Sequence, residues 1–174
     1  VIKVKSITEL KKEIFGPVLH VATFKAGDIS RIVNDINNTG YGLTFGIHSR
    51  IDARIHYLCE NLNIGNIYVN RNQIGAVVGS QPFGGEGLSG TGPKAGGPSY
   101  LYQFIKDEDV RTYDYNDKNI TLENAQILID DCSKVERKAL NSTSLPGPTG
   151  ESNILTTYPK GVILCLGPTK TLAE

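Results

Sequence analysis

The chain has 174 residues, of which 39% are hydrophobic, and its 18 lysine and arginine residues balance 18 aspartate and glutamate residues. This length and composition allow a buried core, and the zero formal net charge gives no electrostatic reason to expect binding to nucleic acid or to an acidic membrane surface. The longest apolar run, Val162–Leu166, is far shorter than the ~20 residues of a membrane span.

The cysteines and the ends of the chain indicate its context. Cys59, Cys132 and Cys165 are widely separated and form no C-x-x-C pair, so they favour a reducing compartment. No basic and then apolar leader begins the sequence, and we therefore expect a cytoplasmic protein. The sequence has no methionine and ends where a new element begins, as expected of a piece of a longer polypeptide.

Strand-like and helix-like patterns alternate over the first hundred residues. Short β-rich runs predict strands over Val18–Phe24, Leu43–His48 and Asn66–Asn70. Strands that alternate with helices of about ten residues are typical of βαβ units. The sequence therefore predicts an α/β fold with a mainly parallel open sheet and flanking helices.

Two helices are predicted between these strands. The first has apolar residues at i, i+3, i+4 and i+7 over Ile29–Ile36 and stops at Gly40. The second begins with a capping box formed by Ser49 and Asp52 and ends at Gly65.

The pattern changes after Ile105. Charged residues and tyrosines fill 106–118, and the apolar spacing over Thr121–Asn141 predicts a long helix. Leu145–Asn153 is rich in turn residues and ends that element. Gly161–Gly167 is predicted to be a buried strand that begins a further α/β unit.

Gly75–Pro98, the glycine-rich segment, holds nine of the 19 glycines and is the strongest functional signal. Glycine lets a backbone approach a ligand closely, and the segment follows the third predicted strand, where α/β sheets bind ligands. Its match to G-x-G-x-x-G over Gly85–Gly90 does not predict a dinucleotide site, because no strand directly precedes it and no helix directly follows.

Residue spacing offers neither a metal site nor a nucleophile. His56 and Cys59 could share a helix face, but no second pair of ligands accompanies them and Cys59 falls on the apolar stripe. Cys132 and Cys165 also lie in apolar patterns, where thiols are usually inert. From the residues alone, the prediction is a binding site on an α/β sheet with the reaction left open.

Three motifs resemble those of aldehyde dehydrogenases. Glu13–Val18 resembles their E-x-F-G-P-V motif, and Asn38–Thr44 and Gly65–Arg71 follow at the distances typical of the family. The glycine-rich segment, GAVVGSQPFGGEGLSGTGPKAGGP, is similar to the Δ1-pyrroline-5-carboxylate dehydrogenase module of bifunctional proline utilization A enzymes, and so is Leu145–Asn153.

The resemblance implies a role for five residues. Glu13 would hold the nicotinamide ribose hydroxyls of NAD, and Phe15 would pack beside the nicotinamide. Gly75 and Ala76 would present backbone N–H groups to the substrate's α-carboxylate, and Phe83 would line the aliphatic part of the aldehyde.

The activity implied is NAD-dependent oxidation of L-glutamate γ-semialdehyde to glutamate in proline catabolism, through a cysteine thiolate. In the family, the nucleophilic cysteine, its oxyanion-hole asparagine, the general-base glutamate and the dinucleotide-binding fold precede the part that this chain resembles. We therefore expect no catalytic residue among these 174 residues, and no activity from them alone. FAD would belong only to the proline dehydrogenase module of the parent enzyme.

Three regions follow from the resemblance. Residues 1–105 would be the C-terminal half of the catalytic domain, 106–144 an oligomerisation strand and helical connector of a homo-oligomer, and 145–174 a linker and the start of a C-terminal domain. Two alternatives stay open: a non-catalytic remnant that acts in binding or assembly, and an aldehyde dehydrogenase of other specificity, which Gly75 and Ala76 with Gly90–Pro98 disfavour.

Overall fold

The computed structural model describes residues 1–73, 76–105, 121–133 and 138–160. The chain divides into two compact units, Val1–Phe104 and Ile105–Glu174. No helix in the described part of the chain has the length and apolar character that crossing a membrane requires.

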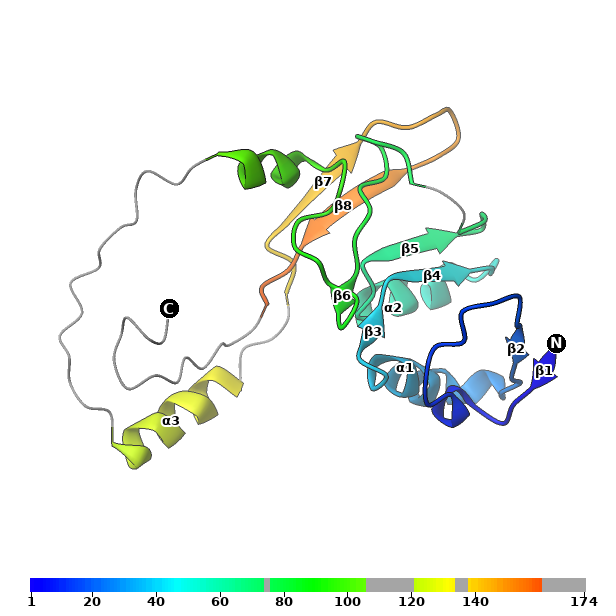
Figure 1. The fold of residues 1–174 in the computed structure, drawn as a ribbon, viewed down its shortest axis with the longest axis horizontal. Coiled ribbons are helices and arrows are strands. Elements are labelled where there is room, and N and C mark those ends of the chain that lie inside the picture. Colours follow the sequence, from blue (N-terminus) through cyan, green and yellow to red (C-terminus); the bar gives the residue numbers. More distant parts are fainter. Residues whose placement is uncertain (74–75, 106–120, 134–137, 161–174) are drawn as a thin grey trace. The chain divides into compact units, whose positions relative to one another are not determined.

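The core of the first unit is a βαβ arrangement. Strands β4 (Thr44–Ile47) and β5 (Asn66–Val69) pair in parallel, with helix α2 (Asp52–Asn61) between them in sequence. Helix α1 (Ile29–Asn37) packs with α2 against the same two strands (Figure 1). The buried residues at the centre of this core are Val33, Ile47, Leu58 and Leu62. Two of the predicted strands and both helices are thus confirmed.

The end of α1 follows its sequence signal. The last helical residue is Asn37, and Gly40 has a φ of +74°, a conformation that glycine adopts without steric cost. The Gly40 N–H donates to the Asn37 carbonyl oxygen at 3.1 Å. The predicted stop at Gly40 is therefore confirmed, with two residues of turn, Asn38 and Thr39, before it.

Both predicted ends of α2 are wrong. Ile51, not Ser49, is the N-cap residue, and the Ser49 hydroxyl accepts from the Ile51 N–H at 3.1 Å outside the helix. The helix ends at Asn61, before Gly65, because the Asn37 side chain donates to the Asn61 carbonyl oxygen at 2.8 Å and accepts from the Asn63 N–H at 2.9 Å.

Further pairs of short strands surround this core. Strands β1 (Ile2–Lys3) and β2 (His20–Val21) are parallel, and β3 (Tyr41–Gly42) and β6 (Glu86–Gly87) are antiparallel. The remaining elements of the first unit are the 3-10 helices η1 (Ile7–Glu9), η2 (Ala26–Asp28) and η3 (Pro98–Phe104).

The α/β class is confirmed, whereas the described residues do not form a single, mainly parallel open sheet. They form four two-stranded sheets, of which two are parallel and two antiparallel. The strand predicted over Val18–Phe24 is reduced to His20–Val21 because it pairs only with the two residues of β1, where no strand was predicted.

The second unit contains helix α3 (Leu122–Ser133) and an antiparallel hairpin of β7 (Asn141–Leu145) and β8 (Asn153–Thr157). The prediction of one helix over Thr121–Asn141 is wrong at its C-terminal end, because Asn141 pairs with Thr157 in the hairpin.

The predicted boundary between residues 144 and 145 falls inside β7, which has residues on both sides of it. The turn-rich segment at Leu145–Asn153 connects the two strands of the hairpin. The charged stretch 106–118 and the strand expected at Gly161–Gly167 lie outside the described residues, and the three-region division stays a prediction.

Candidate functional site

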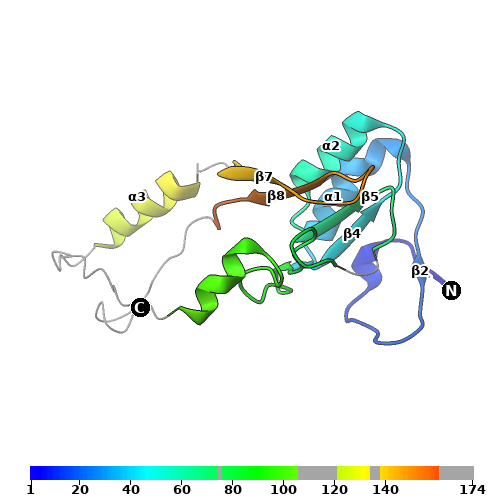
Figure 2. The ribbon, with the colours of Figure 1, turned by 90° about the horizontal axis from the view of Figure 1, so that it is seen from above.

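The glycine-rich segment, which the structure describes from Ala76 onward, contacts the face of β5 that α1 and α2 leave open. Ile67 and Val69 pack against the helices, and since successive side chains of a strand alternate, Asn66 and Tyr68 point to the opposite face. Figure 2 shows α1 and α2 on one side of β4 and β5, with the glycine-rich segment, in green, on the other.

Asn66, the first residue of β5, holds the segment on both sides of Phe83. Its side-chain amide donates to the Pro82 carbonyl oxygen at 2.9 Å, and its carbonyl oxygen accepts from the Gly84 N–H at 3.1 Å. A single side chain thus takes the place of a neighbouring strand for the residues that flank Phe83.

The ammonium group of Lys94 completes this contact. It donates to the Gly65 carbonyl oxygen at 2.5 Å, the Gly84 carbonyl oxygen at 2.7 Å and the Asn66 side-chain oxygen at 3.1 Å. Burial lowers the pKa of the half-buried Lys94, while the Glu86 carboxylate acts in the opposite direction. An ammonium group has three N–H donors, and each of these oxygens can accept one of them.

The backbone of Phe83 pairs with that of Ala95 in both directions. The Phe83 N–H donates to the Ala95 carbonyl oxygen at 3.0 Å, and the Ala95 N–H donates to the Phe83 carbonyl oxygen at 2.8 Å. The Phe83 side chain is half-buried. The residue predicted to line the aldehyde pocket therefore has a backbone fixed relative to β5, although its role stays a prediction.

The backbone of Gly65 lies very close to that of the glycine-rich segment, whereas the predicted close approach of this segment to a ligand stays a prediction. A Cβ atom at this position would overlap the carbonyl oxygen of Gly84 and crowd the Cα atom of Gly85. The Gly65 N–H also donates to the Gly42 carbonyl oxygen at 2.9 Å. The absence of a side chain at Gly65 lets the glycine-rich segment contact the end of the connection between α2 and β5.

The predicted carboxylate-binding end of the segment is only partly described. Gly75 lies outside the described residues, and Ala76 is exposed. From Gly79 onward the segment is held by its own backbone, since the Gly79 N–H donates to the Gly96 carbonyl oxygen at 3.0 Å. The role of Gly75 and Ala76 stays a prediction.

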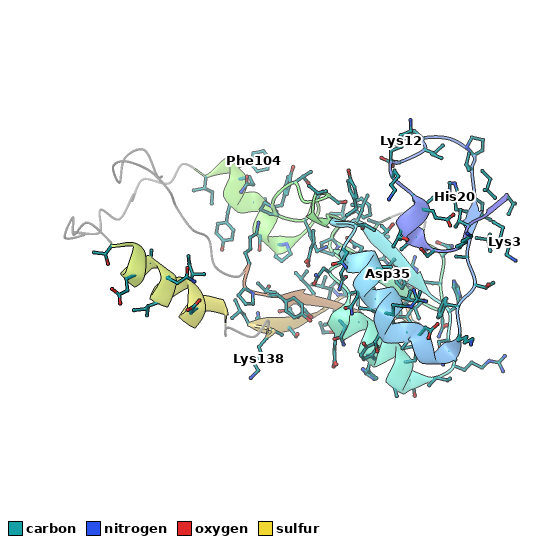
Figure 3. The ribbon with its side chains drawn as sticks, turned by 90° about the horizontal axis from the view of Figure 1, so that it is seen from below. Lys3, Lys12, His20, Asp35, Phe104 and Lys138 are labelled. Carbon is teal, nitrogen blue, oxygen red and sulfur yellow. The ribbon has the colours of Figure 1, made fainter. Side chains whose placement is uncertain are left out.

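The predicted cofactor residues lie elsewhere, on the connection between η1 and β2. Glu13 is exposed and Phe15 is 98% exposed. Within the described residues, no hydrogen bond or ion pair joins either side chain to the glycine-rich segment. In Figure 3 the label Lys12 marks this connection, which in that view lies apart from Asp35 on α1.

The chemical types of Glu13 and Phe15 nevertheless fit a nicotinamide nucleoside. An exposed carboxylate can accept hydrogen bonds from the two hydroxyls of a ribose, and an exposed phenyl ring offers a face for a planar ring.

The described residues offer neither an activated thiol nor a cluster of metal ligands. Burial raises the pKa of the half-buried Cys59 thiol, and the Glu60 carboxylate raises it further, which is opposite to what a nucleophilic thiolate needs. Across the described ranges, no three His, Cys, Asp or Glu side chains gather as metal ligands would.

Sequence reasoning missed Asn66 and Lys94 as the residues that anchor the segment. One signal was present, because Lys94 is the only charged residue between Glu86 and Lys106. A lone charge that is partly buried in a run of small and apolar residues needs polar partners, and the backbone around it supplies them. Its partners are mainly backbone carbonyl oxygens, which no sequence motif specifies.

Comparison with known proteins supplies the family. A sequence model described as "Aldehyde dehydrogenase family" matches residues 4–110. The chain belongs to the aldehyde dehydrogenase family. The resemblance drawn from the motifs of this sequence is thus confirmed at the level of the family.

Individual relatives extend this assignment. The bifunctional protein PutA of Klebsiella aerogenes is 44% identical over 190 residues, covering 95% of this chain and 14% of that protein. The 1-pyrroline-5-carboxylate dehydrogenase of Geobacillus sp. (strain WCH70) is 50% identical over 101 residues, covering 58% of this chain and 19% of that protein. The chain thus spans about one seventh of the PutA relative.

A solved structure shows the same similarity. A point variant of Bradyrhizobium japonicum proline utilization A (PutA) matches with a TM-score of 0.57 and 56% sequence identity, covering 59% of this chain and 10% of that chain. The similarity to PutA extends over nearly the whole chain, whereas the similarity to the separate dehydrogenase covers little more than half.

Proposed function

We propose that the first unit of this chain is part of an NAD-dependent dehydrogenase that oxidises L-glutamate γ-semialdehyde to glutamate in proline catabolism. The observation that carries the proposal is the anchored backbone around Phe83, which holds a half-buried aromatic ring within a glycine-rich segment. The names of the relatives, PutA and 1-pyrroline-5-carboxylate dehydrogenase, support this choice of substrate.

In this proposal the glycine-rich segment binds the substrate. Backbone N–H groups at Gly75 and Ala76 receive the α-carboxylate, since successive amides of small residues form a nest for an anion. Phe83 lines the aliphatic chain of the aldehyde, where an aromatic ring excludes water from an apolar surface.

Glu13 and Phe15 form part of the cofactor site. The Glu13 carboxylate accepts hydrogen bonds from the ribose hydroxyls, and the Phe15 ring packs beside the nicotinamide. When bound, NAD⁺ supplies the acceptor for the hydride that leaves the substrate carbon.

The nucleophile comes from outside these 174 residues. The raised pKa of Cys59 argues against this thiol as the nucleophile, because a thiol that is harder to ionise is a weaker nucleophile at neutral pH. We further propose that the chain works within a larger, cytoplasmic, homo-oligomeric PutA-like polypeptide, whose FAD would bind only to its proline dehydrogenase part.

A chimaera tests this function directly. Residues 4–104 would replace the matching segment of Bradyrhizobium japonicum PutA, and NADH formation would be followed with glutamate γ-semialdehyde and with an aldehyde of the same length that lacks the α-carboxylate. We expect activity that prefers the semialdehyde by at least about tenfold in kcat/KM, since an aldehyde without the α-carboxylate leaves the proposed N–H donors at Gly75 and Ala76 without their partner. Equal activity on both aldehydes would favour an aldehyde dehydrogenase of other specificity.

The 174-residue protein alone serves as the second arm of this experiment. We expect no NADH formation from it, and turnover would contradict the proposal that the nucleophile lies elsewhere. If the chimaera is also inactive while folding normally, the alternative of a non-catalytic binding or assembly module is favoured.

A further inference from the structure

We propose that Lys94 is a positioning residue for Phe83: its ammonium group joins the start of β5 to the residue after Phe83 and so sets where the Phe83 ring lies. That this ring contacts an aldehyde rests on the proposed function; the positioning itself does not.

The acceptors of Lys94 lie on two separate parts of the chain. The Gly84 carbonyl oxygen belongs to the glycine-rich segment, while the Gly65 carbonyl oxygen and the Asn66 side-chain oxygen belong to the start of β5. All three N–H donors of the ammonium group have an acceptor, which leaves it little rotational freedom. Lys94 is therefore a crosslink between the segment and the core strand.

A cationic group suits this crosslink because three oxygens converge on it. Gly65 lacks a Cβ atom, and this lets the Gly84 carbonyl group approach its backbone closely. Partial negative charges brought together in this way repel one another, and a positive group between them offsets this repulsion. A neutral side chain of the same length would leave these acceptors without the charge that draws them together.

The contact passes to Phe83 through its immediate neighbours. Lys94 binds Gly84, and Ala95 pairs with both backbone groups of Phe83, so residues 94–95 hold residues 83–84 at two adjacent points. The Phe83 side chain is only half-buried, so packing alone does not fix it. Loss of the ammonium group would loosen the backbone on which the ring depends.

Amide hydrogen exchange of the 174-residue protein tests the positioning. In Lys94→Met we expect the amides of Phe83, Gly84 and Ala95 to exchange at least about tenfold faster than in the wild type, as expected when local opening becomes easier. Amides of β4 and β5 should change by less than about twofold. Lys25→Met, at an exposed lysine of the same unit, should leave all of these rates unchanged. Wild-type exchange in Lys94→Met would overturn the proposal.

Chemical rescue separates the charge from the packing of the side chain. Lys94→Ala removes a propylammonium-sized group, so added n-propylammonium chloride should restore slow exchange at Phe83 and Ala95. It should not do so in Lys94→Met, where the side chain fills the space, nor should sodium chloride at equal ionic strength rescue either variant. Failure of n-propylammonium to restore protection in Lys94→Ala would overturn the cationic role.

The chimaera with Bradyrhizobium japonicum PutA tests the consequence for substrate. Lys94→Met should raise KM for the semialdehyde by about tenfold and leave KM for NAD⁺ and kcat within about twofold, as loss of binding common to ground and transition states predicts. An unchanged KM would overturn this consequence. Inactivity of the chimaera with the unaltered segment would instead contradict the proposed function, while the exchange rates would still decide whether Lys94 positions Phe83.

Discussion

The two halves of the proposed site differ in how this chain holds them. On the substrate side, Phe83 lies between residues that bind Asn66 and Lys94, and its own backbone pairs with Ala95. On the cofactor side, Glu13 and Phe15 lie on an exposed connection.

This difference indicates which half the first unit can build by itself. Backbone hydrogen bonds and a half-buried ammonium group fix the substrate side, whereas exposed side chains are ordered only when something packs against them. We therefore expect substitutions on the substrate side to change stability, and those on the cofactor side to change binding alone.

The largest effect is expected from Gly65→Ala. The added Cβ atom would overlap the Gly84 carbonyl oxygen, so the glycine-rich segment would have to move away from β5. We expect a loss of about 3 kcal/mol in the free energy of unfolding, measured by urea denaturation, which is typical of overpacking against backbone. Gly27→Ala is the matched control, since a Cβ atom there would meet nothing within 4 Å. If Gly65→Ala and Gly27→Ala have the same free energy of unfolding, the proposed difference between an anchored substrate side and an exposed cofactor side is wrong.

Asn66→Ala comes next. It removes the donor to the Pro82 carbonyl oxygen and the acceptor for both Gly84 and Lys94, and should cost about 2 kcal/mol. Asn66→Asp keeps the acceptor and loses only the donor, so it should cost less than Asn66→Ala. Urea denaturation of both variants measures this order. The reverse order would show that the amide group, rather than the shared oxygen, holds the segment.

The sequence predicted the parts of this fold that have long repeating patterns. The stripe of Ile29–Ile36 marks α1, and Asn66–Asn70 marks β5 to within one residue. The two-residue strands β1 and β6 are too short to leave an alternation. β7, with the sequence NSTSL, is too polar to show one, so its pairing with β8 was missed.

The site was predicted less completely for a different reason. Family motifs suggested roles for Phe83 and Glu13, but they do not state which residues hold them in place. The contact of Lys94 with two backbone carbonyl oxygens depends on how the glycine-rich segment meets β5, and backbone acceptors are common to every residue. Such contacts are visible only in three dimensions.

A smaller effect is expected at Asn70, which links the carboxyl ends of β4 and β5. Its side chain donates to the Ser49 carbonyl oxygen and accepts from the Ser49 N–H, both at 3.0 Å, and its φ is +55°. Asn70→Ala should cost about 1–2 kcal/mol, because it loses both bonds and alanine disfavours positive φ. Asn70→Gly loses the same bonds but suits the backbone, so it should be the more stable variant in urea denaturation. If the alanine and glycine variants are equally stable, the positive φ of residue 70 contributes nothing to the loss in the free energy of unfolding.

The smallest effect on stability is expected from Phe15→Ala, and it decides whether the cofactor half is separate. Phe15 is 98% exposed, so its removal should leave the urea midpoint of the 174-residue protein unchanged within error. In the chimaera, the same substitution should raise KM for NAD⁺ several-fold and leave KM for the semialdehyde unchanged, because the ring lies on the connection that carries Glu13 rather than on the glycine-rich segment. Lys12→Ala, at the exposed residue directly before Glu13, is the matched control and should change neither constant. A fall in stability with Phe15→Ala would show that this ring already packs within the first unit. The cofactor side would then be held by the packing of the first unit, as the substrate side is.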